Sequence, residues 1–312
     1  MKKILLFLTV LFCIQGYSQV SIKIKPSHPN FMQYDAVRLR ILLHNYSSMP
    51  IAFGQNQEIR GDLDFVVYYN NRTLVSKSTN SKQILSGIIL KPGEVRTVTI
   101  DLAKYFSLQK TGDYTVTAIL QHPKLSSKYQ SNQISFRVGT GSSYWHRTFG
   151  VPDYTGKNYG KNVLPRKYDV RVFNNGKTQI YFLIVEDDEK VYAVKRLGFN
   201  LGPEYPPQLV VDGAARFHAM LHINQKVFIY YIYNYNGKLE KRQVYIKTTT
   251  TPFLVVNPTN STVIVDGGRI ALKDIDYEEI KDLPFMDSIY STEQKGDSED
   301  SWEDFGDFDS EK

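Results

Sequence analysis

The chain has 312 residues, 42% of them hydrophobic, and its only cysteine is Cys13. Because Cys13 lies within a leader segment, the rest of the chain holds no disulfide, no thiol nucleophile and no cysteine metal site. The formal charge of +6 hides an asymmetry: residues 274–312 carry fifteen acidic and three basic side chains, which leaves +18 on residues 1–273. A basic body and an acidic tail can attract one another or serve separate partners.

Residues 1–18 have the pattern of a signal peptide. Lys2-Lys3 precedes an apolar run from Ile4 to Ile14, and Gly16-Tyr17-Ser18 provides small residues before a cleavage site. The run is shorter than the ~20 residues that span a bilayer, and no later segment is long enough to do so. We therefore expect export to the periplasm or the medium, with a mature chain that begins near Gln19. The alternative is a lipoprotein anchored through Cys13, but a phenylalanine stands where a lipobox has a small residue.

Residues 19–139 show the repeating pattern of short strands. Apolar and polar residues alternate along four stretches, which is the period of half-buried strands. The apolar sets run from Val37 to Leu43, Leu63 to Tyr69, Tyr114 to Leu120 and Ile134 to Val138. Turn signals such as Lys91-Pro92-Gly93 separate them. This spacing predicts an antiparallel β-sandwich.

Three stretches of this domain carry a family resemblance. Arg38 to Ser47 has the form of a strand followed by an Asn-x-Ser turn, Leu90 to Glu94 leads into a strand, and Gly112 to Ala118 reads Gly-Asp-Tyr-Thr-Val-Thr-Ala. In these stretches the domain resembles bacterial immunoglobulin-like modules, with a layout similar to the BsuPI-type proteinase-inhibitor domain. The resemblance implies an immunoglobulin-like sandwich, and no inhibitory loop carries over residue by residue.

Residues 140–166 interrupt the strand pattern. Gly, Pro, Asn and Tyr are mixed there without a period, so we expect a linker that packs on its neighbours through Trp145 and Phe149. Residues 167–271 again resemble strands, and Asn175-Gly176 between two strand-like runs is a strong hairpin signal. We predict a second antiparallel β-meander, a sandwich or a small barrel. Residues 272–312 are acidic and poor in β-branched side chains, which predicts a disordered tail.

A histidine pair is the most tempting candidate for metal chemistry. His218 and His222 are four residues apart, as in helical zinc motifs, but their neighbours alternate as in a strand. Four strand residues span ~13 Å, so the two rings cannot share one ion. We expect ordinary half-exposed histidines. The sequence predicts no catalytic residue, no metal and no cofactor, and its dispersed basic residues together with export argue against nucleic-acid binding.

Two aromatic groups are candidate binding elements. Tyr231, Tyr233 and Tyr235 share one face of a strand, where they could stack on a glycan or form core. Trp302, Phe305 and Phe308 recur every three residues among acids, a spacing that could dock as one helical turn into a groove with a basic rim.

The expected function is that of an exported, non-enzymatic binding or structural protein of the cell envelope, whose partner is an envelope or extracellular protein. Two alternatives stay open. One is a glycan-binding module that uses the tyrosine face. The other is an unrecognised hydrolase, which a buried histidine–carboxylate pair or a pocket with convergent carboxylates would favour.

Overall fold

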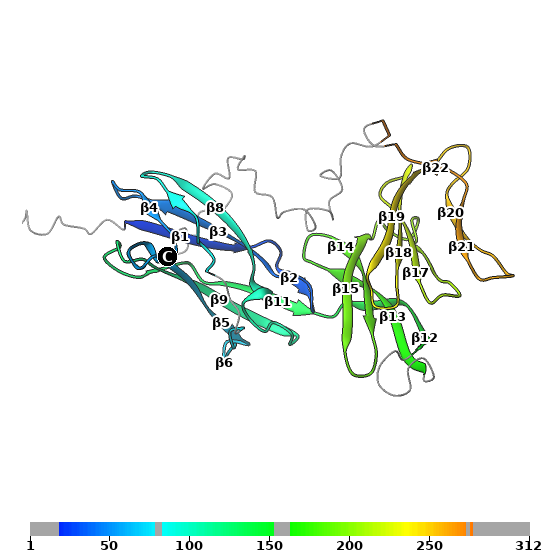
Figure 1. The fold of residues 1–312 in the computed structure, drawn as a ribbon, viewed down its shortest axis with the longest axis horizontal. Coiled ribbons are helices and arrows are strands. Elements are labelled where there is room, and N and C mark those ends of the chain that lie inside the picture. Colours follow the sequence, from blue (N-terminus) through cyan, green and yellow to red (C-terminus); the bar gives the residue numbers. More distant parts are fainter. Residues whose placement is uncertain (1–18, 79–82, 153–162, 273–274, 277–312) are drawn as a thin grey trace, which may run out of the picture.

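The computed structural model describes residues 19–78, 83–152, 163–272 and 275–276. Within these ranges the chain forms 22 strands and two 3-10 helices, Gln57–Ile59 and Leu102–Lys104, which confirms the predicted all-β fold. The strands gather into two layered bodies that follow one another along the chain (Figure 1). The expected signal peptide and most of the expected acidic tail lie outside the described residues.

The first body is a sandwich of two main sheets. Sheet A has the order β1 (Val20–Pro26), β3 (Arg38–Asn45) and β8 (Val95–Asp101). Sheet B has the order β2 (Asn30–Met32), β11 (Ile134–Gly139), β9 (Gly112–Gln121), β5 (Asp62–Tyr69) and β6 (Thr73–Leu74), with β10 (Tyr129–Gln130) beside β9. A short pair, β4 (Ile51–Ala52) and β7 (Ile89–Leu90), completes it.

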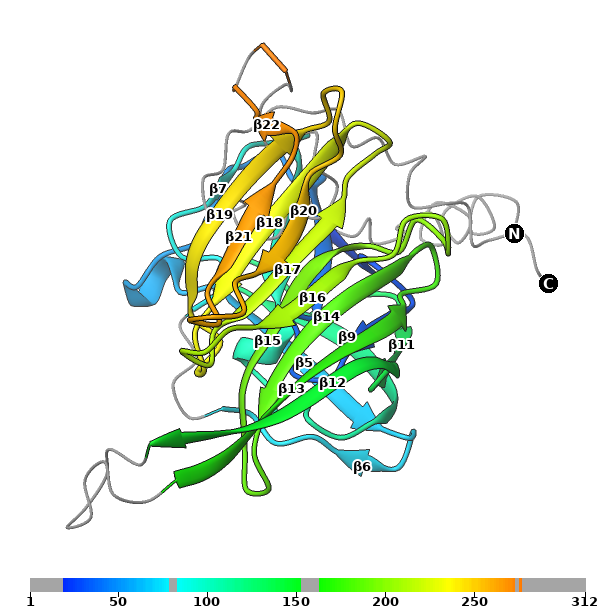
Figure 2. The same ribbon diagram turned by 90° about the vertical axis from the view of Figure 1, so that its right-hand side faces the viewer.

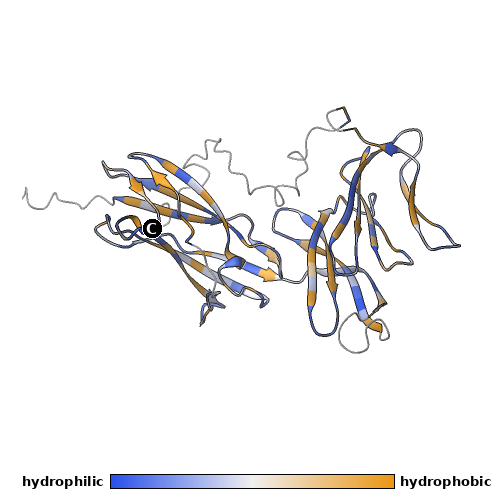
Figure 3. Cartoon of the chain, viewed as in Figure 1, coloured by the Kyte–Doolittle hydropathy of each residue, from blue (hydrophilic) through white to orange (hydrophobic). Residues whose placement is uncertain are grey.

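The alternation read from the sequence forms the core of this sandwich. Leu39, Ile41 and Leu43 of β3 belong to one buried cluster with Tyr114 and Val116 of β9. Most of the other positions of these strands are polar, with Leu42 and Ile119 as exceptions, so hydrophilic and hydrophobic colours largely alternate along the ribbons (Figure 3). Each apolar side chain removed from water contributes roughly 1.5–3 kcal/mol.

The second body contains two further antiparallel sheets, each in chain order. Sheet C consists of β12 (Ser142–Pro152), β13 (Val163–Asn174), β14 (Gln179–Glu186) and β15 (Val191–Phe199). Sheet D consists of β16 (Gln208–Val211), β17 (Phe217–His222), β18 (Val227–Tyr233), β19 (Leu239–Ile246) and β22 (Arg269–Ile270). One buried cluster joins Tyr181 and Leu183 of sheet C to Phe217 and Ile229 of sheet D, so the predicted meander is a sandwich.

A hairpin adds a third layer to this body. Strands β20 (Phe253–Val256) and β21 (Val263–Asp266) pair only with each other among the described strands. Leu254 and Val265 pack against Met220, Phe228 and Tyr230 on the outer face of sheet D. Positions that would face solvent in a two-layer sandwich are therefore covered.

The structure corrects the expectation that residues 140–166 form a linker. Residues 142–152 form β12, which pairs along its length with the next strand, and that strand begins at Val163 rather than after residue 166. The pairing register shifts between Ser143 and Trp145, and such a bulge breaks the alternation that marks a strand in the sequence. Trp145 and Phe149 do pack against the core. The β12–β13 hairpin extends beyond the rest of its sheet (Figure 2).

The two bodies meet at a specific junction. Met32 of β2 is 2% exposed and lies in one cluster with Phe173 and Phe182 of sheet C. The Asp35 carboxylate accepts two hydrogen bonds from Arg196, at 2.9 Å from Nε and 2.6 Å from Nη2. An apolar contact and a two-point ion pair together fix the relative orientation of the two sandwiches.

Candidate functional site

Two concave surfaces lie on the first sandwich. One is a wide, open hollow of about 630 Å³ lined by Tyr69 to Thr73, Gly112, Asp113 and Arg137. The other is more enclosed. It has a volume of about 270 Å³ and is lined by residues of β5 and the segments beside it, including Arg60, Asp64, Lys77 and Tyr105. Lys77 and Asp64 are joined by an ion pair of 2.5 Å, so two of its charged groups neutralise each other. Its volume is below the ~300–1,000 Å³ of common small-molecule sites. The more enclosed hollow is therefore a weak candidate for a ligand site.

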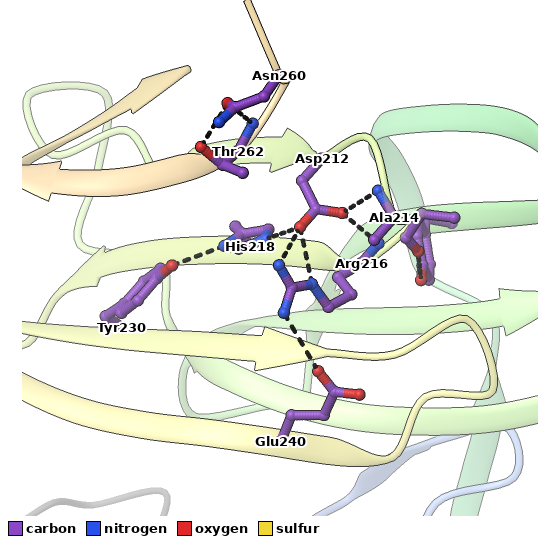
Figure 4. A network of polar contacts seen from close by, with 10 residues as sticks. Asp212, Ala214, Arg216, His218, Tyr230, Glu240, Asn260 and Thr262 are labelled. Atoms are coloured by element: carbon purple, nitrogen blue, oxygen red, sulfur yellow. Dashed lines mark hydrogen bonds and ion pairs between the residues drawn. The ribbon is translucent and has the colours of Figure 1, made fainter. Parts of the chain in front are cut away.

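The densest polar cluster lies in the second sandwich (Figure 4). Phe217 and Ile229 point into the core, so the neighbouring His218 and Tyr230 point to the outer face of sheet D. The β20–β21 hairpin packs on that face. As a result His218 is 1% exposed and Tyr230 is 3% exposed. The turn between β16 and β17 brings Asp212 beside the His218 ring.

Asp212 is the hub of this cluster. Its Oδ1 accepts hydrogen bonds from the backbone N–H groups of Ala214, at 2.9 Å, and Arg216, at 2.8 Å. Its Oδ2 lies 2.7 Å from Nε of Arg216 and 3.1 Å from Nε2 of His218. The other ring nitrogen of His218, Nδ1, lies 2.6 Å from the Tyr230 hydroxyl. Arg216 also lies 4.0 Å from Glu240.

The shifts in pKa indicate which groups of this cluster carry a proton at pH 7. Burial lowers the pKa of His218 despite the opposing carboxylate of Asp212, so the ring is neutral at pH 7. Burial raises the pKa of Tyr230 to about 12, so its hydroxyl keeps its proton. Burial opposes the charge on Asp212, but hydrogen bonds from Arg216 and His218 outweigh it and leave a lowered pKa. The Tyr230 hydroxyl therefore donates to Nδ1, and Nε2–H donates to Asp212.

The polar groups of this cluster form hydrogen bonds with one another rather than facing solvent. Both oxygens of Asp212 already accept two bonds, and both nitrogens of His218 are engaged. The Tyr168 hydroxyl donates to the carbonyl of Ala215 at 2.7 Å, which ties the same turn to sheet C. Gly213 donates to the carbonyl of Ser261 at 3.0 Å, which ties it to the outer hairpin. The arrangement can hold three layers together, and it leaves no lone pair of the ring for a substrate.

The expectation of two half-exposed histidines is correct for His222 and wrong for His218. Local alternation around His218 could not indicate the hairpin that covers this face, because the hairpin, β20 and β21, comes later in the chain. His222 instead packs against Phe228, with ring centroids 4.2 Å apart. Among the described residues, no group of three His, Cys, Asp or Glu side chains is placed to hold a metal.

The tyrosine face is not an exposed binding surface. Tyr231 and Tyr233 are 3% and 4% exposed, and their rings lie in the core between sheets C and D. The pairing register explains this, because Tyr231 lies opposite Ala219 and Tyr233 opposite Phe217, whose side chains face sheet C. Tyr235 is half-buried beyond the end of β18, where its carbonyl accepts from Arg166 at 3.1 Å. The three tail aromatics, Trp302, Phe305 and Phe308, lie outside the described residues.

Comparison with known proteins assigns no family. No family model and no curated protein matches the chain. Among solved structures, the chain is similar to the sporulation control protein Spo0M from Bacillus subtilis, with 8% identity over 58% of this chain and 90% of that one. The TM-score of 0.26 is too low to support any conclusion on fold or function. Within the described ranges, no helix has the length and apolar character needed to cross a membrane.

Proposed function

We propose that the chain is an exported binding or structural protein of the cell envelope, which acts through the surfaces of its two sandwiches and through its acidic, aromatic tail. The main support for this proposal is the junction between the two sandwiches. Met32 is buried among side chains of the second sandwich, and the carboxylate of Asp35 is held by two nitrogens of Arg196. A fixed arrangement of two sandwiches favours a platform that presents surfaces at a set spacing.

The first sandwich fits this role as an immunoglobulin-like module with a BsuPI-type layout. Two features support that assignment. Strand β2 pairs parallel with β11, whereas β1 pairs antiparallel with β3 in the opposite sheet. The Tyr114 hydroxyl, at the start of β9, donates to the carbonyl of Lys110 at 2.8 Å, which is the geometry of a tyrosine corner.

The alternative functions have less support. Stacking on a glycan needs exposed rings, and Tyr231 and Tyr233 are buried. The structure does contain a buried histidine–carboxylate pair, His218 with Asp212, which is the feature expected to favour a hydrolase. A hydrolase also needs a base that reaches substrate, however, and the ring of His218 is engaged at both nitrogens beneath the outer hairpin. Binding of a protein partner needs neither exposed tyrosine rings nor an accessible catalytic base, because sheet faces, sheet edges and a long charged tail are sufficient for it.

The experiment is recovery of the full chain from the envelope of producing cells after cross-linking, with an antibody against the folded body. We expect an N-terminus within a few residues of Gln19. We also expect a co-purifying protein that is lost when Trp302, Phe305 and Phe308 are all replaced by Ala with the tail charges kept. This variant is the matched control for charge, since it changes only the aromatic side chains.

Two results would contradict the proposal. Retention of Met1, or a lipid on Cys13, would refute export as a soluble protein. Equal recovery of every co-purifying protein by the parent and the triple variant would reduce the tail to a solubilising segment.

A further inference from the structure

The wider hollow on the first sandwich is formed by neighbouring strands of sheet B. Its lining comes from the β5–β6 turn, the start of β9 and the middle of β11, namely Tyr69 to Thr73, Gly112, Asp113 and Arg137. Arg137 lies opposite Asp113 in the β9–β11 register, and Tyr69 lies opposite Tyr114 on the other side of β9. The volume of about 630 Å³ falls within the ~300–1,000 Å³ of common small-molecule sites.

The β5–β6 turn is held in place by its own side chains. Asn70 and Asn71 have φ of 49° and 55°, which is the conformation of a type I′ turn and one that asparagine tolerates. Oδ1 of Asn70 accepts from the backbone N–H of Asp113 at 3.1 Å, and Oδ1 of Asn71 accepts from the Thr115 hydroxyl. Both side-chain oxygens are thus used within the protein. Neither amide nitrogen has a hydrogen-bond partner among the described residues, so both remain available as donors.

Gly112 allows the turn to lie directly against the start of β9. Its φ is 144°, and a Cβ there would lie 2.7 Å from Cε2 of Tyr69 and 3.0 Å from Oδ1 of Asn70. The Tyr69 hydroxyl donates to the carbonyl of Thr111 at 2.8 Å, which fixes its ring at the side of the hollow. The lining is therefore ordered before any ligand arrives, and an ordered site loses less entropy on binding.

Two arginines make the hollow rich in cationic donors. Nε of Arg137 lies 3.7 Å from Oδ1 of Asp113, but the two side chains are 68% and 65% exposed. Ion pairs with this exposure contribute little to stability, so a ligand carboxylate can replace Asp113 at Arg137 with little loss. The exposed side chain of Arg72 makes no hydrogen bond or ion pair within the described ranges, so its donors are available as well.

The groups of this lining favour a saccharide that carries a carboxylate. Guanidinium groups bind a carboxylate through two parallel hydrogen bonds. The asparagine amides can donate to the hydroxyl groups of a sugar ring, while Asp113 and Thr73 can accept from them. The side chain of an acidic peptide would occupy the arginines but leave these acceptors unused, because an ionised carboxylate has no proton to donate.

We propose that this hollow binds a uronate, the carboxylate-bearing sugar of acidic polysaccharides. Arg72 and Arg137 hold the carboxylate, and the polar groups of the turn and of Asp113 hold the ring hydroxyls. The site is separate from the buried tyrosine face and from the acidic tail. It therefore goes beyond the proposed function and does not depend on it.

The test is calorimetric titration of the mature chain with trigalacturonate and with trimannuronate, which differ in the orientation of their hydroxyl groups. We expect saturable binding of at least one of them. The methyl ester of the same trisaccharide keeps the hydroxyl groups without the charges, so it should bind about tenfold more weakly or worse. Arg72→Gln/Arg137→Gln should cause a similar loss for the acid. The matched control Arg60→Gln/Arg147→Gln removes two exposed arginines outside the hollow and should keep the parental affinity.

A second measurement does not depend on the variants. In nuclear magnetic resonance spectra of the isotope-labelled, unaltered chain, the uronate should shift the side-chain amide signals of Asn70 and Asn71 and the backbone signal of Gly112. Absence of saturable binding by both acids, equal affinity for the ester, or equal losses in the two double variants would each overturn the inference. Shifts confined to the second sandwich, or a triglutamate peptide that binds as tightly as the sugar, would do so too. None of these results bears on partner capture by the tail, which the cross-linking experiment tests separately.

Discussion

His218 shows how burial changes the role of a single residue. Its position in β17 alternates with core residues and would face water in a two-layer sandwich. The outer hairpin encloses it, and desolvation then lowers its pKa, so the ring folds in its neutral form. Neutral histidine can donate to Asp212 while accepting from Tyr230, which links three segments in one chain of hydrogen bonds.

This burial predicts a pH-dependent stability. In the unfolded chain His218 binds a proton below its ordinary pKa of ~6.5, whereas the folded protein resists protonation until a lower pH. The unfolded state therefore binds more protons in that window, and stability falls as pH falls below ~6.5, by up to ~1.4 kcal/mol per pH unit. Urea unfolding at several pH values should show a shallower slope for His218→Gln than for the parent.

The matched control is His222→Gln. His222 is only half-buried, although burial lowers its pKa as well, so this variant should remove less of the slope. If His218→Gln kept the parental dependence on pH, the ring would be charged in the folded state and the assigned proton positions would be wrong.

At the scale of strands and turns, the alternation of apolar and polar residues predicts a strand correctly where one face of the strand meets a core and the other meets water. Strand β9 fits this rule, with Tyr114, Val116 and Ala118 inward. The pattern fails for β14, which is buried from Ile180 to Val185, because one face packs on sheet D and the other on the junction. It fails for β12 as well, where a bulge changes which side chains face inward. The failure at β14 is non-local, since its covering layers come from distant parts of the chain, whereas the failure at β12 is a local irregularity of the backbone.

The Asn175-Gly176 turn was recognised from local chemistry alone, and it makes a further prediction. Gly176 has φ of 94°, and a Cβ there would lie 2.1 Å from Cγ of Pro29 in the first sandwich. Gly176→Ala should therefore destabilise the protein through backbone strain of ~1–3 kcal/mol and through this clash. Gly202→Ala is the matched control, because Gly202 has φ of 105° and open space around its Cβ position. Equal losses of unfolding free energy in the two variants would show that the Pro29 contact contributes nothing.

At the scale of the whole molecule, the junction decides whether the two sandwiches act as one platform. The ion pair is partly buried, since both the Asp35 and the Arg196 side chains are 17% exposed. Hydrogen bonds between charged groups in such a setting contribute ~1.5–3 kcal/mol. Neither partner could be matched from the sequence, because 161 positions separate them. Because Asp35 belongs to the first sandwich and Arg196 to the second, the pair reports on their relative orientation.

Exchanging the two charges tests that role. Asp35→Arg alone places a cation opposite Arg196, and Arg196→Asp alone places a carboxylate opposite Asp35, so each single variant should loosen the junction. Small-angle scattering should then show a broader distribution of distances in each single variant, while Met32 and its apolar neighbours keep the sandwiches in partial contact. The double variant Asp35→Arg/Arg196→Asp restores opposite charges and should recover much of the parental profile, with a coupling free energy of ~0.5–3 kcal/mol in a double-mutant cycle. Parental profiles in both single variants would show that the sandwiches are oriented without this ion pair, and the apolar cluster around Met32 would then hold the platform by itself.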